Sequence, residues 1–155
     1  MEWNTALESF GSSLGIDGLA PDVDGSCALL FDSRDEVTFT HDGEDHALFM
    51  YCEIGDASAL SKDACLALLE ASLLGAKTGG AALSVHGALG RVVLWKRFDD
   101  NALTPDTLSL AVNDFLAQVS VWKKRLAELN AAPDVEEAPS EGTSLDTMNN
   151  FGMFV

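Results

Sequence analysis

The N-terminal half of the chain shows one helical stripe followed by three strand-like runs. The stripe has spacings of 4, 3 and 4 residues and consists of Trp3, Leu7, Phe10 and Leu14. These spacings place all four side chains on one side of a helix, and Gly15 follows as a suitable C-cap. Strand patterns then occupy 27–31, 37–41 and 47–54. Because 47–54 is apolar on both faces, we expect a central strand or a sheet covered on both sides.

The segment 61–75 predicts a helix that is apolar almost all the way round. Ser61 is a favoured N-cap residue, Asp63 suits the first turn, and Gly75 marks the end. The apolar residues of this helix are Cys65, Leu66, Leu68, Leu69, Leu73 and Leu74. A helix of this kind needs burial on two sides, and a domain this small covers one of them. We therefore expect a second copy of the chain to cover the other side.

A hairpin and a long helix complete the predicted fold. The runs 81–85 and 91–98 predict two strands joined by a turn, and Thr104 and Pro105 begin the helix as N-cap and first residue. Its apolar seam is Leu108, Val112, Phe115, Val119, Trp122, Leu126 and Leu129. This heptad spacing is typical of a coiled coil or of a helix lying across a sheet. We expect the sheet, because three heptads are short for a coiled coil.

The elements together predict an α+β fold with the order α-β-β-β-α-β-β-α. Helices would pack on a twisted antiparallel sheet, and the protein would be a homodimer. The length of 155 residues indicates one domain, 1–130, followed by an acidic tail, 131–155, whose last eight residues are MNNFGMFV. Two interpretations of this apolar end remain open, a frayed terminus and a docking peptide. The docking residues would be Phe151, Met153, Phe154 and Val155.

Composition and charge narrow the possible partners. The formal net charge of −16 excludes nucleic acid and anionic membranes as natural partners, because both require basic patches. No apolar run approaches the roughly 20 residues of a membrane span, and the N-terminus lacks the pattern of a signal peptide. We therefore expect a cytoplasmic protein in which Cys27, Cys52 and Cys65 are reduced and buried. The acidic surface is compatible with solubility alone or with a basic partner segment.

Candidate catalytic and metal-binding residues are sparse. His41 and His46 flank the turn at 42–43 and would need Asp45 to form a metal site, while His86 has no partner in its own segment. The sequence KTGG at 77–80 leads into a strand and not into a helix, so it does not form a phosphate loop. The acids within apolar runs, Glu53 and Glu70, are expected to face water or to pair with a base. We therefore expect no catalysis, metal or cofactor, and a small enzyme is the least favoured alternative.

Three stretches of the chain carry a resemblance to a known family. They are LGI with DGSCALLFD (14–16 and 24–32), LLEASLLGAKTGGAAL (68–83), and RVVLWKRF (91–98) with the later WKKRL (122–126). Over roughly residues 3–127 the chain resembles the class I chaperones of bacterial type III secretion, which are small acidic dimers that escort effector proteins. The resemblance implies the same element order that the periodicity predicts, and a homodimer.

The resemblance also implies a function without catalysis or nucleotide. Such a dimer holds the N-terminal segment of a secreted effector extended and competent for export, through strand addition and apolar pockets. The implied dimer residues are Leu66, Leu69, Leu73, Val93 and Trp95. The implied client-binding residues are Trp3, Leu7, Phe10, Leu29 and Phe39. For each of these residues the alternative is an ordinary place in the core.

Two further hypotheses follow from this comparison. A regulatory protein of the same fold, which sequesters a transcriptional regulator, is the alternative to an effector chaperone. The acidic tail departs from the family pattern, and we hypothesise that MNNFGMFV occupies a client groove when no client is bound.

Overall fold

The computed structural model describes residues 3–131, which form three α-helices and five strands. In chain order the main elements are α1 (Trp3–Ser13), β1 (Ser26–Phe31), β2 (Asp35–Asp42), β3 (Ala47–Asp56), α2 (Lys62–Ser72), β4 (Ala82–His86), β5 (Arg91–Asp99) and α3 (Pro105–Ala131). Short 3-10 turns, η1 (Leu73–Gly75) and η2 (Asp100–Ala102), follow α2 and β5. This order confirms the α+β fold predicted from the sequence.

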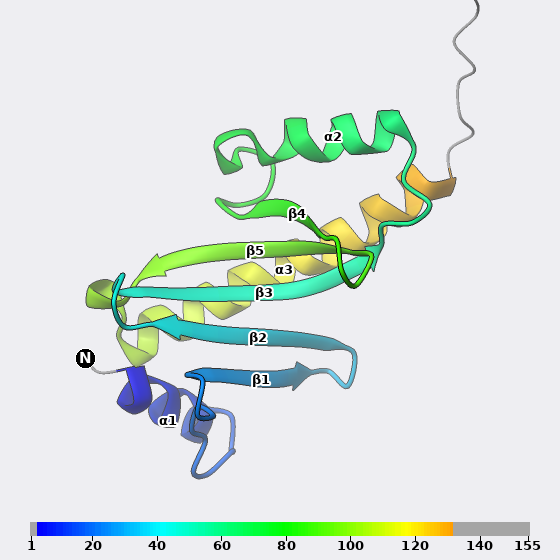
Figure 1. The fold of residues 1–155 in the computed structure, drawn as a ribbon. Helices are drawn as coiled ribbons and strands as arrows, with labels where there is room; N and C mark the ends of the chain where they lie inside the picture. Colours follow the sequence, from blue (N-terminus) through cyan, green and yellow to red (C-terminus); the bar gives the residue numbers. More distant parts are fainter. Residues whose placement is uncertain (1–2, 132–155) are drawn as a thin grey trace, which may run out of the picture.

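The five strands form one antiparallel sheet in the order β1-β2-β3-β5-β4 (Figure 1). The strand β3 lies at its centre, as the apolar pattern on both of its faces predicts. The chain leaves β3 through α2, forms the edge strand β4 and returns as β5 beside β3. Tyr51 of β3 is therefore opposite Thr38 of β2 on one side and Trp95 of β5 on the other.

One face of the sheet carries the core. The α3 seam packs there, behind the sheet in Figure 1, with six buried residues: Leu108, Val112, Phe115, Val119, Trp122 and Leu126. This confirms the prediction of a helix across a sheet. At Gly55 a Cβ atom would come within 2.4 Å of Leu126 Cδ2, so a glycine is required where α3 comes close to β3.

The helix α1 covers the β1–β2 end of the same face. Trp3, Leu7 and Phe10 are buried against Phe39, as the stripe predicts. The prediction is wrong for Leu14, which follows the last helical residue and is exposed. The reason is an early helix end: the backbone N–H groups of residues 14 and 16 both donate to the carbonyl oxygen of Gly11, and Gly15 has φ +76°.

The helix α2 begins as expected but presents a different set of side chains to the core. The Ser61 hydroxyl accepts a hydrogen bond from the Ala64 N–H at 3.0 Å, which confirms the N-cap. The residues that face the core are Ala64, Leu68 and Ala71. The expectation of three buried cysteines is therefore wrong for Cys65, which is exposed because it lies on the outward side of α2. Cys27 and Cys52 are buried.

The tail predictions fall outside the described residues. The proposed docking residues Phe151, Met153, Phe154 and Val155 belong to 132–155, and their role stays a prediction. The domain boundary at residue 130 and the homodimer also stay predictions.

Candidate functional site

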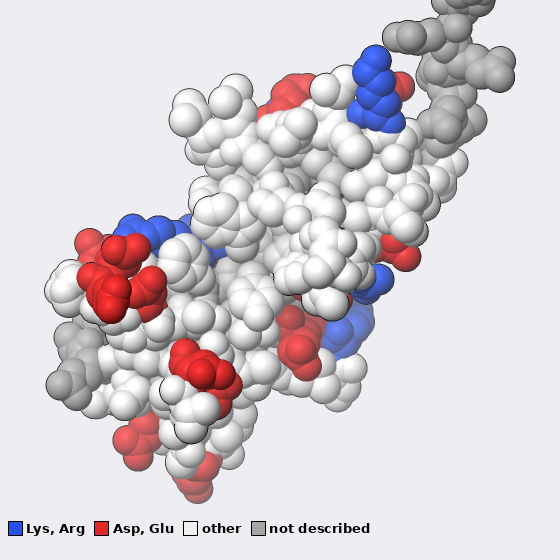
Figure 2. Space-filling view, viewed as in Figure 1, with Lys and Arg blue, Asp and Glu red and all other residues white. Residues whose placement is uncertain are grey.

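The sheet face opposite the three helices is not covered by any other part of 3–131. We call it the open sheet face; its main residues are Thr38, Thr40, Phe49, Tyr51, Val93 and Trp95. It exists because the side chains of Phe49, Tyr51 and Glu53 on β3 point away from the core, while those of Leu48, Met50 and Cys52, which alternate with them, point into it. Figure 2 views the molecule from this side, and uncharged side chains occupy most of the band from α2 across β4 and β5.

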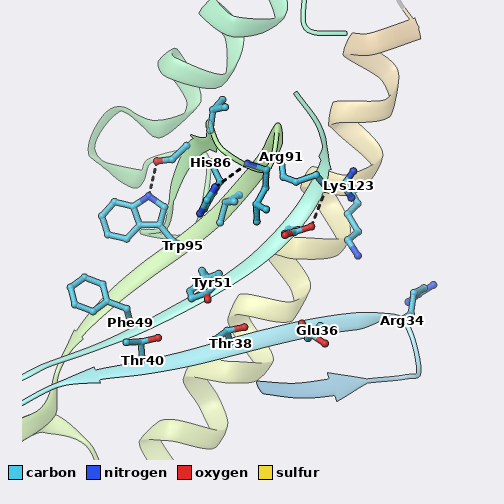
Figure 3. A pocket seen from close by; sticks show the side chains of 15 residues that line it. Arg34, Glu36, Thr38, Thr40, Phe49, Tyr51, His86, Arg91, Trp95 and Lys123 are labelled. Atoms are coloured by element: carbon cyan, nitrogen blue, oxygen red, sulfur yellow. Dashed lines mark hydrogen bonds and ion pairs between the residues drawn. The ribbon is translucent and has the colours of Figure 1, made fainter. Parts of the chain in front are cut away.

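A shallow groove of about 820 Å³ runs along the open sheet face (Figure 3). Phe49 and Trp95 form its aromatic floor, with their ring centroids 6.3 Å apart. The indole N–H of Trp95 donates to the Ser84 hydroxyl at 2.8 Å, which fixes the ring against β4. The hairpin residues Val85 and Leu89 border the groove and are exposed. The groove is thus an apolar surface with few polar anchors, which suits a protein segment.

Paired charges stand at the margins of the groove. Arg91 Nε lies 3.0 Å from Glu53 Oε2, and Lys123 Nζ lies 2.5 Å from Asp35 Oδ1, which is nearly buried. Away from the groove, Glu70 on α2 pairs with Lys77 at 2.7 Å. The expectation that Glu53 and Glu70 pair with a base is therefore confirmed. Because these charges are compensated locally, the groove does not share the strong negative charge of the whole chain.

The outward face of α2 is the second exposed apolar surface. The α2 outward face consists of Cys65, Leu66, Leu69, Leu73 and Leu74. Leu66, Leu69 and Leu73 are 54%, 67% and 67% exposed, and Leu74 is 94% exposed with φ 54°. Four large apolar side chains this exposed on α2 and the adjoining turn η1 indicate a surface that a partner covers.

The loop after α2 holds its exposed leucines in one conformation. The Gly80 N–H donates to the Gly75 carbonyl at 2.9 Å, and the two glycines approach so closely that a Cβ on Gly75 would lie 2.5 Å from Gly80 Cα. The buried Thr78 hydroxyl donates to the carbonyl oxygen of Ala81. Gly75, Gly79 and Gly80 all have positive φ, which only glycine adopts without strain. The stretch LLGAKTGG is therefore explained by a tight turn that presents leucines, and not by phosphate binding.

The histidines that flank the β2–β3 turn meet at a carboxylate that sequence analysis missed. His41 Nε2 and His46 Nδ1 lie 3.0 Å and 3.4 Å from Asp100 Oδ2, and the His41 ring stacks on Trp3 with centroids 5.9 Å apart. The hydrogen bond from His41 lowers the pKa of Asp100 below its usual value, and His46 adds to this. Asp45, which was considered as a metal ligand with them, instead accepts a hydrogen bond from Arg97 at its carbonyl.

His41, His46 and Asp100 lie together beside a second pocket, which Trp3 also lines. No group of three or more His, Cys, Asp and Glu is placed to hold a metal ion among residues 3–131. No helix in that range is long and apolar enough to cross a membrane. Burial raises the pKa of the Cys52 thiol to about 11, so this cysteine stays protonated and unreactive at neutral pH.

The predicted dimer residues lie on the two exposed apolar surfaces. Leu66, Leu69 and Leu73 belong to the α2 outward face, and Trp95 belongs to the open sheet face. Val93 lines the groove on the same sheet face but is only 9% exposed. Phe49 and Tyr51 also lie on the open sheet face and were not among the predicted site residues. The apolar pattern on both faces of 47–54 was the feature that pointed to them.

The predicted client-binding residues are all placed in the core. Trp3, Leu7, Phe10, Leu29 and Phe39 have exposures between 0% and 9%. A client would reach these side chains only if α1 moved away from β2. Their role in client binding therefore stays a prediction, and the surface next to them that is exposed is Leu30 on the edge strand β1.

Solved structures with the same fold include several complexes. A chain in the ExsC-ExsE complex has a TM-score of 0.72 and 19% identity, with coverage of 81% of this chain and 97% of that one. A chain in the HopA1-SchA chaperone-effector complex has a TM-score of 0.65 and 21% identity, covering 81% and 93%. A chain in the complex of the Yersinia pestis type III secretion chaperone SycH with a fragment of YscM2 has a TM-score of 0.63 and 17% identity, covering 77% and 98%.

A family match agrees with this fold. No curated protein matches the sequence, whereas residues 5–123 match the Tir chaperone protein (CesT) family. The matched range holds all five strands, α2 and most of α1 and α3. It confirms, at the level of the family, the resemblance to class I type III secretion chaperones. The chain thus belongs to the Tir chaperone protein (CesT) family.

Proposed function

We propose that this protein is a type III secretion chaperone that binds the N-terminal segment of a secreted effector and keeps it competent for export. The observation that carries the proposal is the family match over residues 5–123. The fold is also shared with SchA or HopA1 in a chaperone-effector complex and with a chain of the SycH complex. The protein would act in the bacterial cytoplasm, without catalysis and without a cofactor.

The proposed working unit is a homodimer built from the two exposed apolar surfaces. In a twofold dimer the α2 outward face of one copy would pack on the open sheet face of its partner, and the same contact would form twice. Leu69 and Leu73 would then lie against Tyr51, Val93 and Trp95. Burying leucine side chains that are two-thirds exposed would contribute roughly 1.5–3 kcal/mol for each one that becomes fully covered.

The proposed client site is the β1 edge of the sheet and the adjoining α1. The strand β1 is an edge strand. Its outer backbone groups beyond Ser26, which is bonded to Asp22, would be available to an added strand. Leu30 is exposed on this strand, while Leu29 points into the core. An extended client segment would therefore gain backbone hydrogen bonds and one apolar contact without any change in the core.

Affinity purification from the native bacterium tests the proposal. The tagged full chain should retain one secreted protein, and an N-terminal fragment of that protein should be retained alone. Leu30→Glu should weaken the capture, whereas Leu110→Glu, at an equally exposed leucine on α3, should not. Retention of a transcriptional regulator in place of a secreted protein would favour the regulatory alternative and contradict the proposal.

A further inference from the structure

The open sheet face needs a cover in a single subunit. Tyr51 is 38% exposed there, and Val85 and Leu89 at the border are 54% and 60% exposed. The groove volume of about 820 Å³ lies within the range of pockets that enclose small ligands. Its floor of Phe49 and Trp95 offers aromatic faces to whatever binds. In a lone subunit, this surface would otherwise contact water.

The sequence after α3 supplies a segment of matching chemistry. Residues 132–155 follow the last described residue, and their first sixteen contain five carboxylates and no Lys or Arg. The remaining eight, MNNFGMFV, are uncharged and carry the apolar residues Phe151, Met153, Phe154 and Val155. Aromatic rings and methionine thioethers pack favourably on aromatic side chains. The apolar end of the tail therefore suits the floor of the groove.

The length of the linker allows the apolar end to reach the groove of its own subunit. Lys123 lines the groove, and α3 continues from it to Ala131, which is about 12 Å along a helix axis. Residues 132–150 would span about 24 Å on average as a coil. The linker is thus longer than the distance back along α3 to the near end of the groove, and its apolar end is held at a millimolar effective concentration.

Arg34 is the basic residue at the near end of the groove that can attract an acidic linker, because Arg91 and Lys123 are already paired with Glu53 and Asp35. Three bases, Arg34, Arg91 and Lys123, and two acids, Glu36 and Glu53, line the groove, whereas the whole chain has nine Lys and Arg residues against 25 acids. The Arg34 side chain is 71% exposed and its partner Asp35 is 3.8 Å away, so its charge is available to a further carboxylate. Elsewhere the acidic surface would repel the linker.

We propose that the apolar end of the tail, residues 151–155, occupies the open sheet face of its own subunit and competes there with a second copy of the chain. The proposal rests on the proposed homodimer, because it assigns the same face to both occupants. The tail would thereby set the concentration at which the subunits pair. A subunit without a partner would keep its aromatic groove covered, and pairing would release two tails.

Competition of this kind has a predictable size. Both subunits must release their tails before they pair, so the effect of the tail on the dissociation constant enters twice. If the tail is docked about three quarters of the time, the apparent Kd of the dimer rises about 16-fold.

The test compares three full-length chains by sedimentation over a dilution series. Phe151→Ser with Phe154→Ser removes the aromatic anchors, and Asn149→Ser with Asn150→Ser is the matched control. The double phenylalanine variant should dimerise with a Kd about 16-fold lower than the wild type, and the control should not differ from the wild type. Equal Kd values for all three chains would overturn the proposal.

A second readout separates this proposal from the homodimer. The indole N–H of Trp95 bonds to Ser84 on the open sheet face, whereas the indoles of Trp3 and Trp122 are buried in the core. The NMR signal of the Trp95 indole N–H can be assigned with Trp95→Phe. At concentrations where both chains are monomeric, this signal should differ between the wild type and the double variant Phe151→Ser with Phe154→Ser. An identical Trp95 signal would overturn tail docking. If no chain dimerises at any concentration, the homodimer fails, and the Trp95 signal alone decides whether the tail docks.

Discussion

Tyr51 on β3 and Trp95 on β5 are direct partners across two antiparallel strands, and both lie on the sheet face that no described helix covers. Their neighbours on the other face of the same strands, Met50 and Leu94, are fully buried beneath the helices. One face of β3 and β5 is therefore buried beneath the helices, and the other face is an apolar surface that no described helix covers. The α2 outward face is the other exposed apolar surface. A second copy of the chain could cover both surfaces in a twofold dimer.

A charge on the α2 outward face should separate the dimer. Leu69→Glu would bury an uncompensated carboxylate in the proposed interface, which typically costs about 3 kcal/mol or more and corresponds to over a hundredfold in Kd. Sedimentation equilibrium measures the change. Leu110→Glu is the matched control, because Leu110 is 65% exposed on α3. A dimer unaffected by Leu69→Glu would remove α2 from the interface.

The single exposed thiol offers a chemical check of the same surface. Cys65 is exposed on α2, while Cys27 and Cys52 are buried, and burial raises the pKa of both buried thiols. At high dilution a maleimide should therefore label one cysteine per native chain and three per unfolded chain. At concentrations that favour pairing, Cys65 should react more slowly. A Cys65 rate that does not depend on concentration would argue against this interface.

The turn that presents Leu73 and Leu74 should tolerate no side chain at Gly75. An alanine there would combine φ +66° with a Cβ atom 2.5 Å from Gly80 Cα. Left-handed strain and backbone displacement together should lower the free energy of unfolding by about 2 kcal/mol or more. Urea denaturation measures this. Gly87→Ala is the control, because a Cβ there meets nothing within 4 Å, and equal losses for both variants would contradict the predicted packing.

The His41–Asp100 contact should make stability depend on acid pH. The pKa of Asp100 is lowered in the folded state by the hydrogen bond from His41, so the carboxylate stabilises the fold above the ordinary Asp pKa of about 3.9. This stabilisation is lost as the pH falls through the lower folded pKa. Asp100→Asn should therefore be less stable than wild type near pH 5, and the difference should shrink toward pH 3.

Urea unfolding at several pH values measures that difference. Asp17→Asn, which changes an exposed carboxylate in the loop after α1, is the control and should not reproduce the trend. A difference for Asp100→Asn that is constant from pH 5 to pH 3 would show that the ion pair does not form.

Local patterns were enough to predict the elements and one of the two exposed surfaces. The α3 seam and the α2 leucines repeat at helical spacing, and the Ser61 hydroxyl lies three residues before the Ala64 N–H group from which it accepts a hydrogen bond. Each of these features is therefore contained in a short stretch of sequence. Leu14 was misplaced because the bonds to the Gly11 carbonyl, and not the apolar spacing, decide where α1 ends.

Contacts between segments far apart in the sequence could not be predicted from local patterns. Asp100 is 59 residues from His41, and nothing in either segment indicates their pairing. The groove likewise depends on β5 lying between β3 and β4, which places Trp95 between Tyr51 and the edge strand. The client residues were expected from the family resemblance, with a place in the core as the alternative, and their large apolar side chains explain why they are buried there.

The central claim is that two copies of the chain cover each other's exposed apolar surfaces. The mass of the full chain in solution tests this claim most directly. Sedimentation equilibrium at micromolar concentration should give twice the 16.5 kDa mass of one chain, and dilution should return it to the mass of one. A constant mass of one chain across the whole concentration range would contradict the account, because the α2 leucines and the aromatic sheet face would then have no second copy to cover them.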